Sequence, residues 1–189
     1  MQLPELHRRL WQMLEHAVSD SGHGFYTGVL ANAADARIVV LRSASREAAH
    51  ILFYSDRRAP KIAALHADPC ATLVVYAAPC QLRVRGRISI HVDDSLSDEY
   101  WARCPLSSRR AYLASAAPGS PLLVAGSGLP SALDTRAPTA EESTPGRANF
   151  AVLRLAIDEI DCLLLEASGH RRAAFRRQGT TLVSEWRIP

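Results

Sequence analysis

The first hydrophobic pattern in the chain has a helical period. Apolar residues recur every three or four positions between residues 3 and 17, with charged residues between them. Pro4 suits a first helical turn, and Ser21 and Gly22 favour the end of a helix. The apolar face comprises Leu3, Leu6, Leu10, Met13, Leu14 and Ala17. We therefore expect one amphipathic helix within residues 1–20.

After this helix the apolar period changes to two, or to continuous apolar runs, which is the pattern of β-strands. The runs are separated by short polar turns at intervals of about a dozen residues, which favours antiparallel neighbours over parallel ones. The expected strands are 24–31, 36–44, 49–56, 70–78, 80–91, 149–157, 159–167, 170–178 and 181–189. Short helices are expected at 58–69, 93–104 and 107–117, the last capped by Ser107 or Ser108.

The clearest alternation lies in residues 80–91. Leu82, Val84, Ile88 and Ile90 alternate with Gln81, Arg83, Arg85, Arg87, Ser89 and His91. One face of this strand is expected to lie in the core, and the other carries a row of arginines. Such a row serves either to keep a surface strand soluble or to line a ligand site or subunit interface.

The segment 116–148 breaks the pattern because it is rich in Pro, Gly, Ser and Ala. We expect a long flexible loop here, with a capping-box candidate from Thr139 to Glu142. The whole pattern predicts a single domain over residues 1–189, mainly β with α-helices inserted between the strands. A small antiparallel barrel is the simplest closure, and a sandwich is the alternative.

Composition narrows the class of protein. A chain of 189 residues with 48% apolar residues can bury one core, and a net charge of +3 spread over its length does not demand a polyanionic partner. The four cysteines are too widely spaced for a C-x-x-C motif, and neither a signal peptide nor a transmembrane run is found. We expect a cytoplasmic protein with unpaired thiols that binds neither membranes nor nucleic acid.

Familiar catalytic motifs are absent. The sequence contains no P-loop, no G-x-G-x-x-G and no H-E-x-x-H, and its seven histidines are scattered singly. These absences argue against a nucleotide triphosphatase, a zinc hydrolase and a metal site in general. No catalytic acid or base is identified.

A set of anion-binding groups remains around the first strands. Lys61 is the only lysine among 22 basic residues, and it falls in the first turn of an expected helix, where free backbone N–H groups favour an anion. Arg37 and Arg42 flank one expected strand, but five residues of spacing point them to opposite faces unless a twist, a bulge or the strand end intervenes. Tyr54, Ser55 and Arg58 lie between that strand and Lys61. The set predicts a phosphate site.

The order of these segments resembles a known superfamily. The run "ARIVVLR...HILFYSDRRAPKIAALHADPCATLVVY...CQLRVRGR" is similar to the core of the pyridoxamine 5′-phosphate oxidase-like, FMN-binding split-barrel proteins. The "DRR.PK" and "GHRRA.F" forms resemble a generic FMN-binding subgroup and not the vitamin B6 enzyme itself. The resemblance covers most of the chain from about residue 25 and implies an antiparallel split β-barrel.

The resemblance also implies site residues. Arg37 and Arg42 would contact the FMN phosphate and the pocket wall, and Lys61 the phosphate. Along the cofactor it implies Ile38, Val39, Val40 and Leu41 through their backbone, Tyr54 and Ser55 beside phosphate and ribityl, and Gln81 and Arg83 near the isoalloxazine edge. Ala59 and Pro60 replace the Ser-Arg of the family, so Arg58 or Arg57 would have to supply the missing arginine ligand.

The implied activity is that of an FMN-dependent oxidoreductase acting on a small organic substrate, in a homodimer with FMN at the subunit interface. The substrate-phosphate motif of the B6 enzyme is broken at His170, Arg171 and Arg172, so the resemblance does not extend to the substrate of that enzyme. A flavin-binding or sensing module without turnover is one alternative. A basic nucleic-acid-binding barrel is another, and it predicts a strongly salt-dependent affinity for nucleic acid.

Overall fold

The computed structural model describes residues 1–32 and 35–189. They form two compact units. The first unit comprises residues 1–53, 64–89 and 154–189, and the second comprises residues 54–63 and 90–153. The chain passes between them several times, so neither unit is one continuous stretch of sequence.

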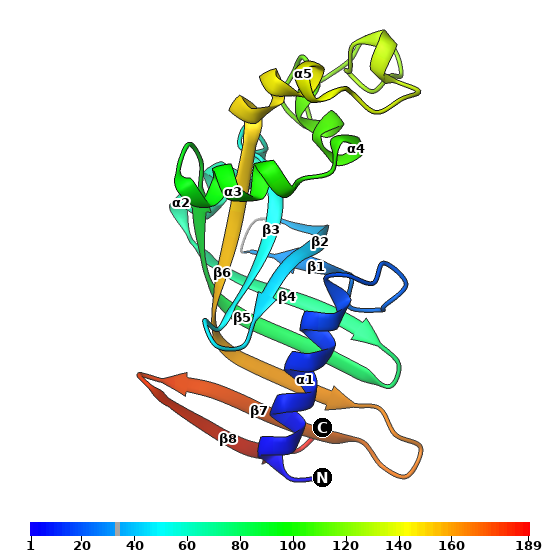
Figure 1. Cartoon of the computed structure of the whole chain (residues 1–189). Coiled ribbons are helices and arrows are strands. Elements are labelled where there is room, and N and C mark those ends of the chain that lie inside the picture. The colour runs from blue at the N-terminus through cyan, green and yellow to red at the C-terminus, as the bar shows by residue number, and fades with distance from the viewer. Residues whose placement is uncertain (33–34) are drawn as a thin grey trace. The chain divides into compact units, whose positions relative to one another are not determined.

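Helices and strands alternate along the chain much as the pattern predicts (Figure 1). The helices are α1 (Leu3–Ala17), α2 (Pro60–Ala67), α3 (Ser95–Arg103), α4 (Leu106–Arg109) and α5 (Ala140–Ser143). The strands are β1 (Thr27–Ala31), β2 (Ala36–Ser45), β3 (His50–Asp56), β4 (Cys70–Ala77), β5 (Cys80–His91), β6 (Phe150–Leu164), β7 (Arg171–Gln178) and β8 (Thr181–Arg187). None of the helices formed by the described residues is long and apolar enough to cross a bilayer.

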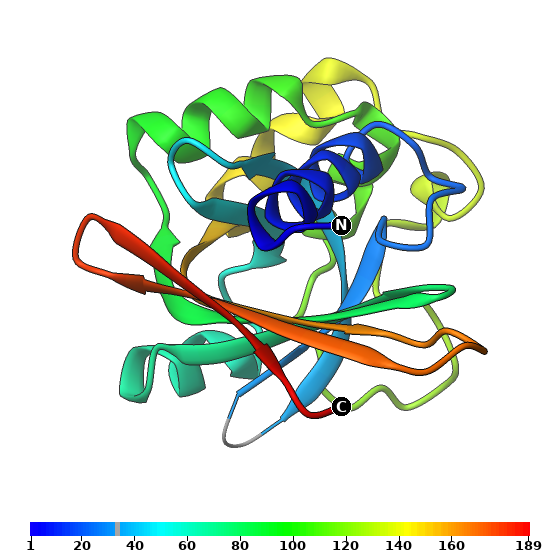
Figure 2. The ribbon, with the colours of Figure 1, turned by 90° about the horizontal axis from the view of Figure 1, so that it is seen from below.

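The strands form one sheet in the order β3-β2-β1-β4-β5-β6-β7-β8, and an additional pairing of β3 with β6 closes the first six into a barrel. In the first unit this closure includes a hydrogen bond of 2.9 Å from the Ile157 N–H to the Ala49 carbonyl. Strands β7 and β8 continue the sheet past β6 as a hairpin (Figure 2). The predicted antiparallel split barrel is confirmed, and the sandwich alternative is wrong.

Strand β5 alternates as its sequence predicts. Leu82 and Val84 are fully buried and Ile88 nearly so, whereas Arg85 and Arg87 are exposed. The buried face joins Leu73 of β4 in the core of the first unit. Burial of such side chains is the main favourable term for closing this barrel.

Helix α1 buries its apolar face within its own unit. Leu6, Leu10 and Leu14 are at most 1% exposed, and the helix contacts β2 and β8. The Trp11 indole N–H donates a hydrogen bond of 3.1 Å to Nε2 of His7, whose ring lies 5.0 Å from that of Phe175 on β7. The helix predicted within residues 1–20 is therefore confirmed and belongs to the core of this unit.

Strand β6 corrects one prediction. The sequence suggests separate strands at 149–157 and 159–167, but Phe150–Leu164 forms one strand of 15 residues. The polar residues Asp158, Glu159 and Asp161 do not interrupt it, because Glu159 and Asp161 find arginine partners on neighbouring strands.

A close approach between β5 and β6 in the first unit constrains the residue type at position 86. A Cβ atom added at Gly86 of β5 would lie 1.9 Å from the carbonyl oxygen of Ala156 on β6. Real side chains never approach backbone so closely, so only glycine fits at this position.

The second unit is held by an aromatic cluster. The rings of Tyr54, Trp101 and Tyr112 lie 4.9, 5.2 and 5.1 Å from that of Phe150, measured between centroids. Helix α3 begins with a capping box in which the Asp94 carboxylate accepts a hydrogen bond from the Ser97 N–H at 2.8 Å. These rings supply the large apolar area that a unit of this size needs.

The helix expected at 107–117 is shorter and begins earlier. Its N-cap is Pro105, so the predicted cap at Ser107 or Ser108 is wrong, and α4 passes at once into a 3-10 turn, Arg110–Leu113. Within 116–148, expected as a long flexible loop, the chain forms the 3-10 turn Ser131–Leu133, α5 and the start of the 3-10 helix Thr144–Asn149. The capping box from Thr139 to Glu142 is confirmed.

Candidate functional site

Strand β2 carries the first group of predicted residues, in the first unit. It pairs antiparallel with β1, with Ile38 opposite Val29. Val39 and Leu41 point into the core, while Val40 is half-buried and Ile38 is 74% exposed. The predicted run from Ile38 to Leu41 therefore presents apolar side chains on both faces of the sheet.

A β-bulge lies at Arg42. Leu41 of β2 pairs with Phe53 of β3, but Ser43 pairs with Leu52, so Arg42 is an extra residue opposite one step of the partner strand. The spacing of Arg37 and Arg42 required a twist, a bulge or a strand end if both were to serve one ligand, and a bulge is present. Arg37 forms an ion pair with Asp35.

Tyr54 and Ser55 continue β3 within the second unit. The Tyr54 hydroxyl donates a hydrogen bond of 3.4 Å to the Tyr100 carbonyl. Ser55 is 4% exposed, and its hydroxyl donates a hydrogen bond of 3.2 Å to the Asp56 carbonyl. Both hydroxyls retain oxygen lone pairs that could accept further hydrogen bonds.

Arg58 has a carboxylate partner that sequence reasoning missed. Its Nε and Nη2 donate to the two oxygens of Asp56 at 3.0 and 2.7 Å, and its Nη1 donates to the Ala114 carbonyl at 3.1 Å. The hydrogen bond to Asp56 raises the pKa of Arg58. The motif "SDRR" indicates that Asp56 can pair with a nearby arginine, since Arg57 and Arg58 follow it directly. The sequence does not show which of the two arginines forms the pair.

Lys61 lies in the first turn of α2 and is half-buried. Its ammonium and the Arg58 guanidinium come from the same short connection between β3 and α2. The neighbouring Arg57 instead pairs with Asp93 at 2.7 Å. This connection therefore offers positive charge and hydroxyl groups close together in the chain, which is the donor set that a phosphate group requires.

Gln81 and Arg83 lie on β5 in the first unit. Arg83 pairs in register with Val74 of β4, and its guanidinium lies 3.2 Å from the carboxylate of Asp161 on β6. Asp161 is 3% exposed and also accepts hydrogen bonds from Arg172. Burial opposes the ionisation of Asp161, but the hydrogen bonds from Arg172 and Arg83 outweigh it and hold its pKa below the usual range.

The register places several of these residues in one row. Ile38, Val29, Val74 and Arg83 are consecutive partners across β2, β1, β4 and β5. Directly paired residues in a sheet point to the same face. The predicted residues Ile38 and Arg83 therefore share the outer face of this sheet, with two valines between them.

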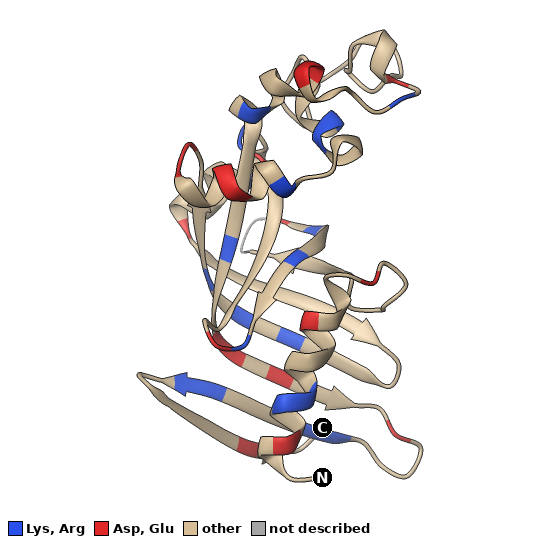
Figure 3. Cartoon of the chain, viewed as in Figure 1, with Lys and Arg blue, Asp and Glu red and all other residues tan. Residues whose placement is uncertain are grey.

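Charged residues continue this face over the next strands. Figure 3 shows basic and acidic positions alternating from β5 to β6 and β7. Arg172 and Arg187 reach Asp161 at 3.0 and 3.6 Å, and Arg176 reaches Glu159 at 3.0 Å. Among the described residues, no group of three or more His, Cys, Asp or Glu is placed to hold a metal ion.

Comparison with known proteins gives the fold. Neither protein-family models nor curated proteins match the chain. Among solved structures, a pyridoxamine 5′-phosphate oxidase-related, FMN-binding protein from Nostoc punctiforme PCC 73102 is similar over 100% of both chains, with a TM-score of 0.74 and 22% identity. PhzG from Burkholderia lata 383, in complex with tetrahydrophenazine-1-carboxylic acid, is similar over 98% of this chain and 92% of its own, with a TM-score of 0.70 and 17% identity.

At these identities the likeness concerns the fold. It extends over the whole chain in the Nostoc case and agrees with the six-stranded closure described above. The order of strands, the helix that precedes them and the β7–β8 hairpin all fall within the matched length. The chain therefore has the split-barrel fold of the pyridoxamine 5′-phosphate oxidase-like proteins.

Proposed function

We propose that this protein binds FMN and acts as an oxidoreductase on a small organic substrate. The observation that supports the proposal is the full-length likeness to the Nostoc FMN-binding protein. Bound FMN would supply two-electron redox chemistry. The substrate and the electron acceptor are outside the proposal.

Each predicted residue has a distinct task in this proposal. Lys61 would neutralise the phosphate, and Arg58, Arg37 and Arg42 would donate hydrogen bonds to it from guanidinium N–H groups that their present partners leave over, while Tyr54 and Ser55 would contribute hydroxyls. The backbone of residues 38–41 would run along the cofactor. These residues fit the group chemically, since a phosphate favours several charge-assisted donors and a flavin ring favours apolar cover.

Gln81 and Arg83 would lie at the polar edge of the flavin ring. The buried Asp161 carboxylate lies 3.2 Å from the Arg83 guanidinium. Asp161 would therefore fix the position of the guanidinium and lower the net positive charge of the pair at the flavin edge. A positive group at that edge stabilises negative charge that develops on reduction.

Binding is tested first by the colour of the purified protein and by titration with FMN, followed through quenching of flavin fluorescence. Lys61→Ala removes a charge-assisted hydrogen bond, which is worth about 1.5–3 kcal/mol, so we expect affinity to fall at least tenfold. Arg8→Ala is the matched control, because Arg8 is an exposed cation on α1, and its affinity should be unchanged. A colourless protein that ignores added FMN contradicts the proposal.

A flavin-binding or sensing module without turnover is the second candidate. The observation that favours it is that Arg171 is paired with Glu166 at 2.6 Å and Arg172 with Asp161 at 3.0 Å, so the arginines of the broken substrate motif are already neutralised. Anaerobic mixing with NADPH and with small organic donors separates the two candidates. Bleaching of the flavin band by any donor supports the oxidoreductase, and its persistence with all of them supports the module.

We also propose that the protein is a homodimer with FMN at the subunit interface, in the cytoplasm. The exposed apolar side chains of Ile38 and Val29 on the outer sheet face support a partner there, because monomers seldom leave adjoining apolar side chains uncovered. The described cysteines, Cys70, Cys80, Cys104 and Cys162, are free thiols, which agrees with a reducing compartment.

A further inference from the structure

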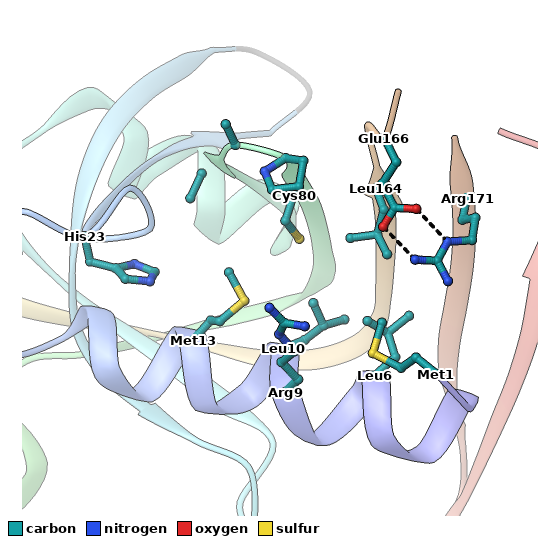
Figure 4. A pocket seen from close by; sticks show the side chains of 13 residues that line it. Met1, Leu6, Arg9, Leu10, Met13, His23, Cys80, Leu164, Glu166 and Arg171 are labelled. Atoms are coloured by element: carbon teal, nitrogen blue, oxygen red, sulfur yellow. Dashed lines mark hydrogen bonds and ion pairs between the residues drawn. The ribbon is translucent and has the colours of Figure 1, made fainter. Parts of the chain in front are cut away.

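A cavity of about 310 Å³ lies in the first unit, and none of the residues that line it is assigned to FMN, although Cys80 precedes Gln81 on β5. It is bounded by α1, the turn between β4 and β5, and the segment between β6 and β7 (Figure 4). Its volume is at the lower end of the range of about 300–1,000 Å³ typical of small-molecule sites. It is therefore large enough for a compact organic ligand.

Most of the cavity wall is apolar. The accessible apolar surface comes from Met1, Met13, Ala77, Ala78 and Pro79, whereas the lining residues Leu6, Leu10 and Leu164 are buried. Met1 and Met13 are unbranched and flexible, so this part of the wall can adapt to the shape of a ligand. The wall favours a ligand with an apolar body.

One side chain brings net positive charge to the cavity. Arg9 extends from α1 toward Cys80 (Figure 4), and no ion pair of Arg9 is found among the described residues. The other arginine of the lining, Arg171, is neutralised by Glu166 at 2.6 Å. Arg9 also helps to lower the pKa of Cys80, after the larger effect of the neighbouring Cys162 thiol, which places its charge close to the cavity.

His23 adds a polar group to the cavity, on the side opposite Glu166 and Arg171 (Figure 4). Its Nδ1 accepts a hydrogen bond of 3.0 Å from the Phe25 N–H, so the proton of the neutral ring is on Nε2, which can donate. The lining thus combines one unpaired guanidinium and one imidazole N–H with apolar walls. A guanidinium matches the two oxygens of a carboxylate with two parallel hydrogen bonds.

We propose that this cavity binds a small carboxylic acid with an apolar body of about ten non-hydrogen atoms, its carboxylate on the Arg9 guanidinium and its body against Met13, Ala77 and Pro79. This site is separate from the proposed FMN site and uses none of its residues. Its occupancy is therefore expected to be the same with and without added FMN.

The two methionines make the site directly observable. Met1 and Met13 are the only methionines in the sequence, and both line the cavity. Protein labelled with ¹³C in the methionine methyl groups is titrated with 3-phenylpropanoate and with octanoate, and each titration is repeated with the matching alcohol. We expect both methyl signals to shift with an affinity of about 1 mM or tighter for the acids, and at least tenfold weaker binding for the alcohols.

Arg9→Gln tests the charge. It should weaken acid binding at least tenfold and leave alcohol binding unchanged, whereas Arg9→Lys should recover part of the affinity. Arg8→Gln, an exposed arginine one residue away, is the control and should bind as the unchanged protein does. The methyl signals of each variant without ligand report whether the cavity is intact, and Arg9→Lys keeps the test decisive if Arg9→Gln does not fold.

Three results would overturn the proposal. They are no shift of either methyl signal with the acids, equal affinity for acids and alcohols, and unchanged acid binding in Arg9→Gln. Loss of FMN binding without loss of acid binding would count against the proposed function alone. Loss of acid binding alone would count against this site.

Discussion

At the scale of single residues, the buried carboxylate of Asp161 is the centre of a network. It is 3% exposed, and Arg83, Arg172 and Arg187 all lie within 3.6 Å. Asp161→Asn leaves these guanidiniums without their shared counter-charge, and breaking a buried pair in this way costs about 3–5 kcal/mol. We expect the urea midpoint to fall accordingly, with the slope of the transition unchanged.

The control for this change is Glu185→Gln. Glu185 pairs with Arg187 at 2.8 Å but its side chain is 55% exposed, so its loss should change stability by less than about 1 kcal/mol. Equal effects of the two variants would show that Asp161 acts as an ordinary surface charge.

His7 predicts a pH dependence of stability. Burial, with a smaller contribution from Arg46, lowers its pKa from 6.5 to about 4. Between pH 6.5 and pH 4, His7 is therefore protonated in the unfolded chain but neutral in the folded one. Part of the free energy of unfolding that is present above pH 6.5 is lost as the pH falls toward 4. The loss is about 3 kcal/mol, since each pKa unit corresponds to about 1.4 kcal/mol.

The measurement is the free energy of unfolding at several pH values between 4 and 7, in His7→Gln and in the unchanged protein. An amide oxygen can still accept the Trp11 hydrogen bond but does not titrate, so the variant should lose this part of the pH dependence. His16→Gln is the control, because the His16 side chain is 65% exposed. Parallel curves for His7→Gln and the unchanged protein would contradict the argument.

The local sequence revealed some of these residues and not others. Lys61 and the arginines of β2 are visible as basic residues at the expected ends of elements, and their spacing requires a twist, a bulge or the strand end if both arginines serve one ligand. The partners of Asp161 come from β5, β7 and β8, which only the completed sheet brings together. The cavity around Arg9 is hidden for the same reason, because its walls come from distant segments.

At the scale of elements, the close approach of β5 and β6 requires glycine at position 86. Gly86→Ala would put a methyl group 1.9 Å from the Ala156 carbonyl oxygen, which requires the strands to separate. We expect a loss of at least about 3 kcal/mol, at the upper end of overpacking costs. Thermal unfolding measures it, with Gly126→Ala as control, because a Cβ there meets nothing closer than 4.0 Å. Equal melting temperatures would contradict the close approach.

Element boundaries were predictable where one physical signal dominates. The alternation in β5 gives its bounds residue for residue, because one face is core and the other is polar. In β6 the run Asp158–Glu159 suggests a turn, yet the strand continues because its charges are paired across the sheet. The helix after α3 begins at Leu106 and not after a serine, because Pro105 already precedes it in an extended conformation.

At the scale of the whole molecule, the outer row Ile38, Val29 and Val74 predicts self-association. Ile38→Lys places a charge in the proposed interface, and burying an unpaired charge is unfavourable. We expect light scattering coupled to size exclusion to give twice the chain mass of 20.6 kDa for the unchanged protein and a monomer for this variant. Glu47→Lys, in the exposed turn after β2, is the control and should remain dimeric. A monomeric unchanged protein, with FMN present, would contradict the proposed dimer.

The packing of α1 has a consequence for how the chain folds during its synthesis. α1 is synthesised before β8, one of the strands it contacts, and before Phe175, against which His7 lies. Until β7 and β8 emerge, Leu6, Leu10 and Trp11 lack part of their cover. Packing of this end of α1 can therefore be completed only after β7 and β8 have been synthesised, and until then its apolar face is open to association with other chains.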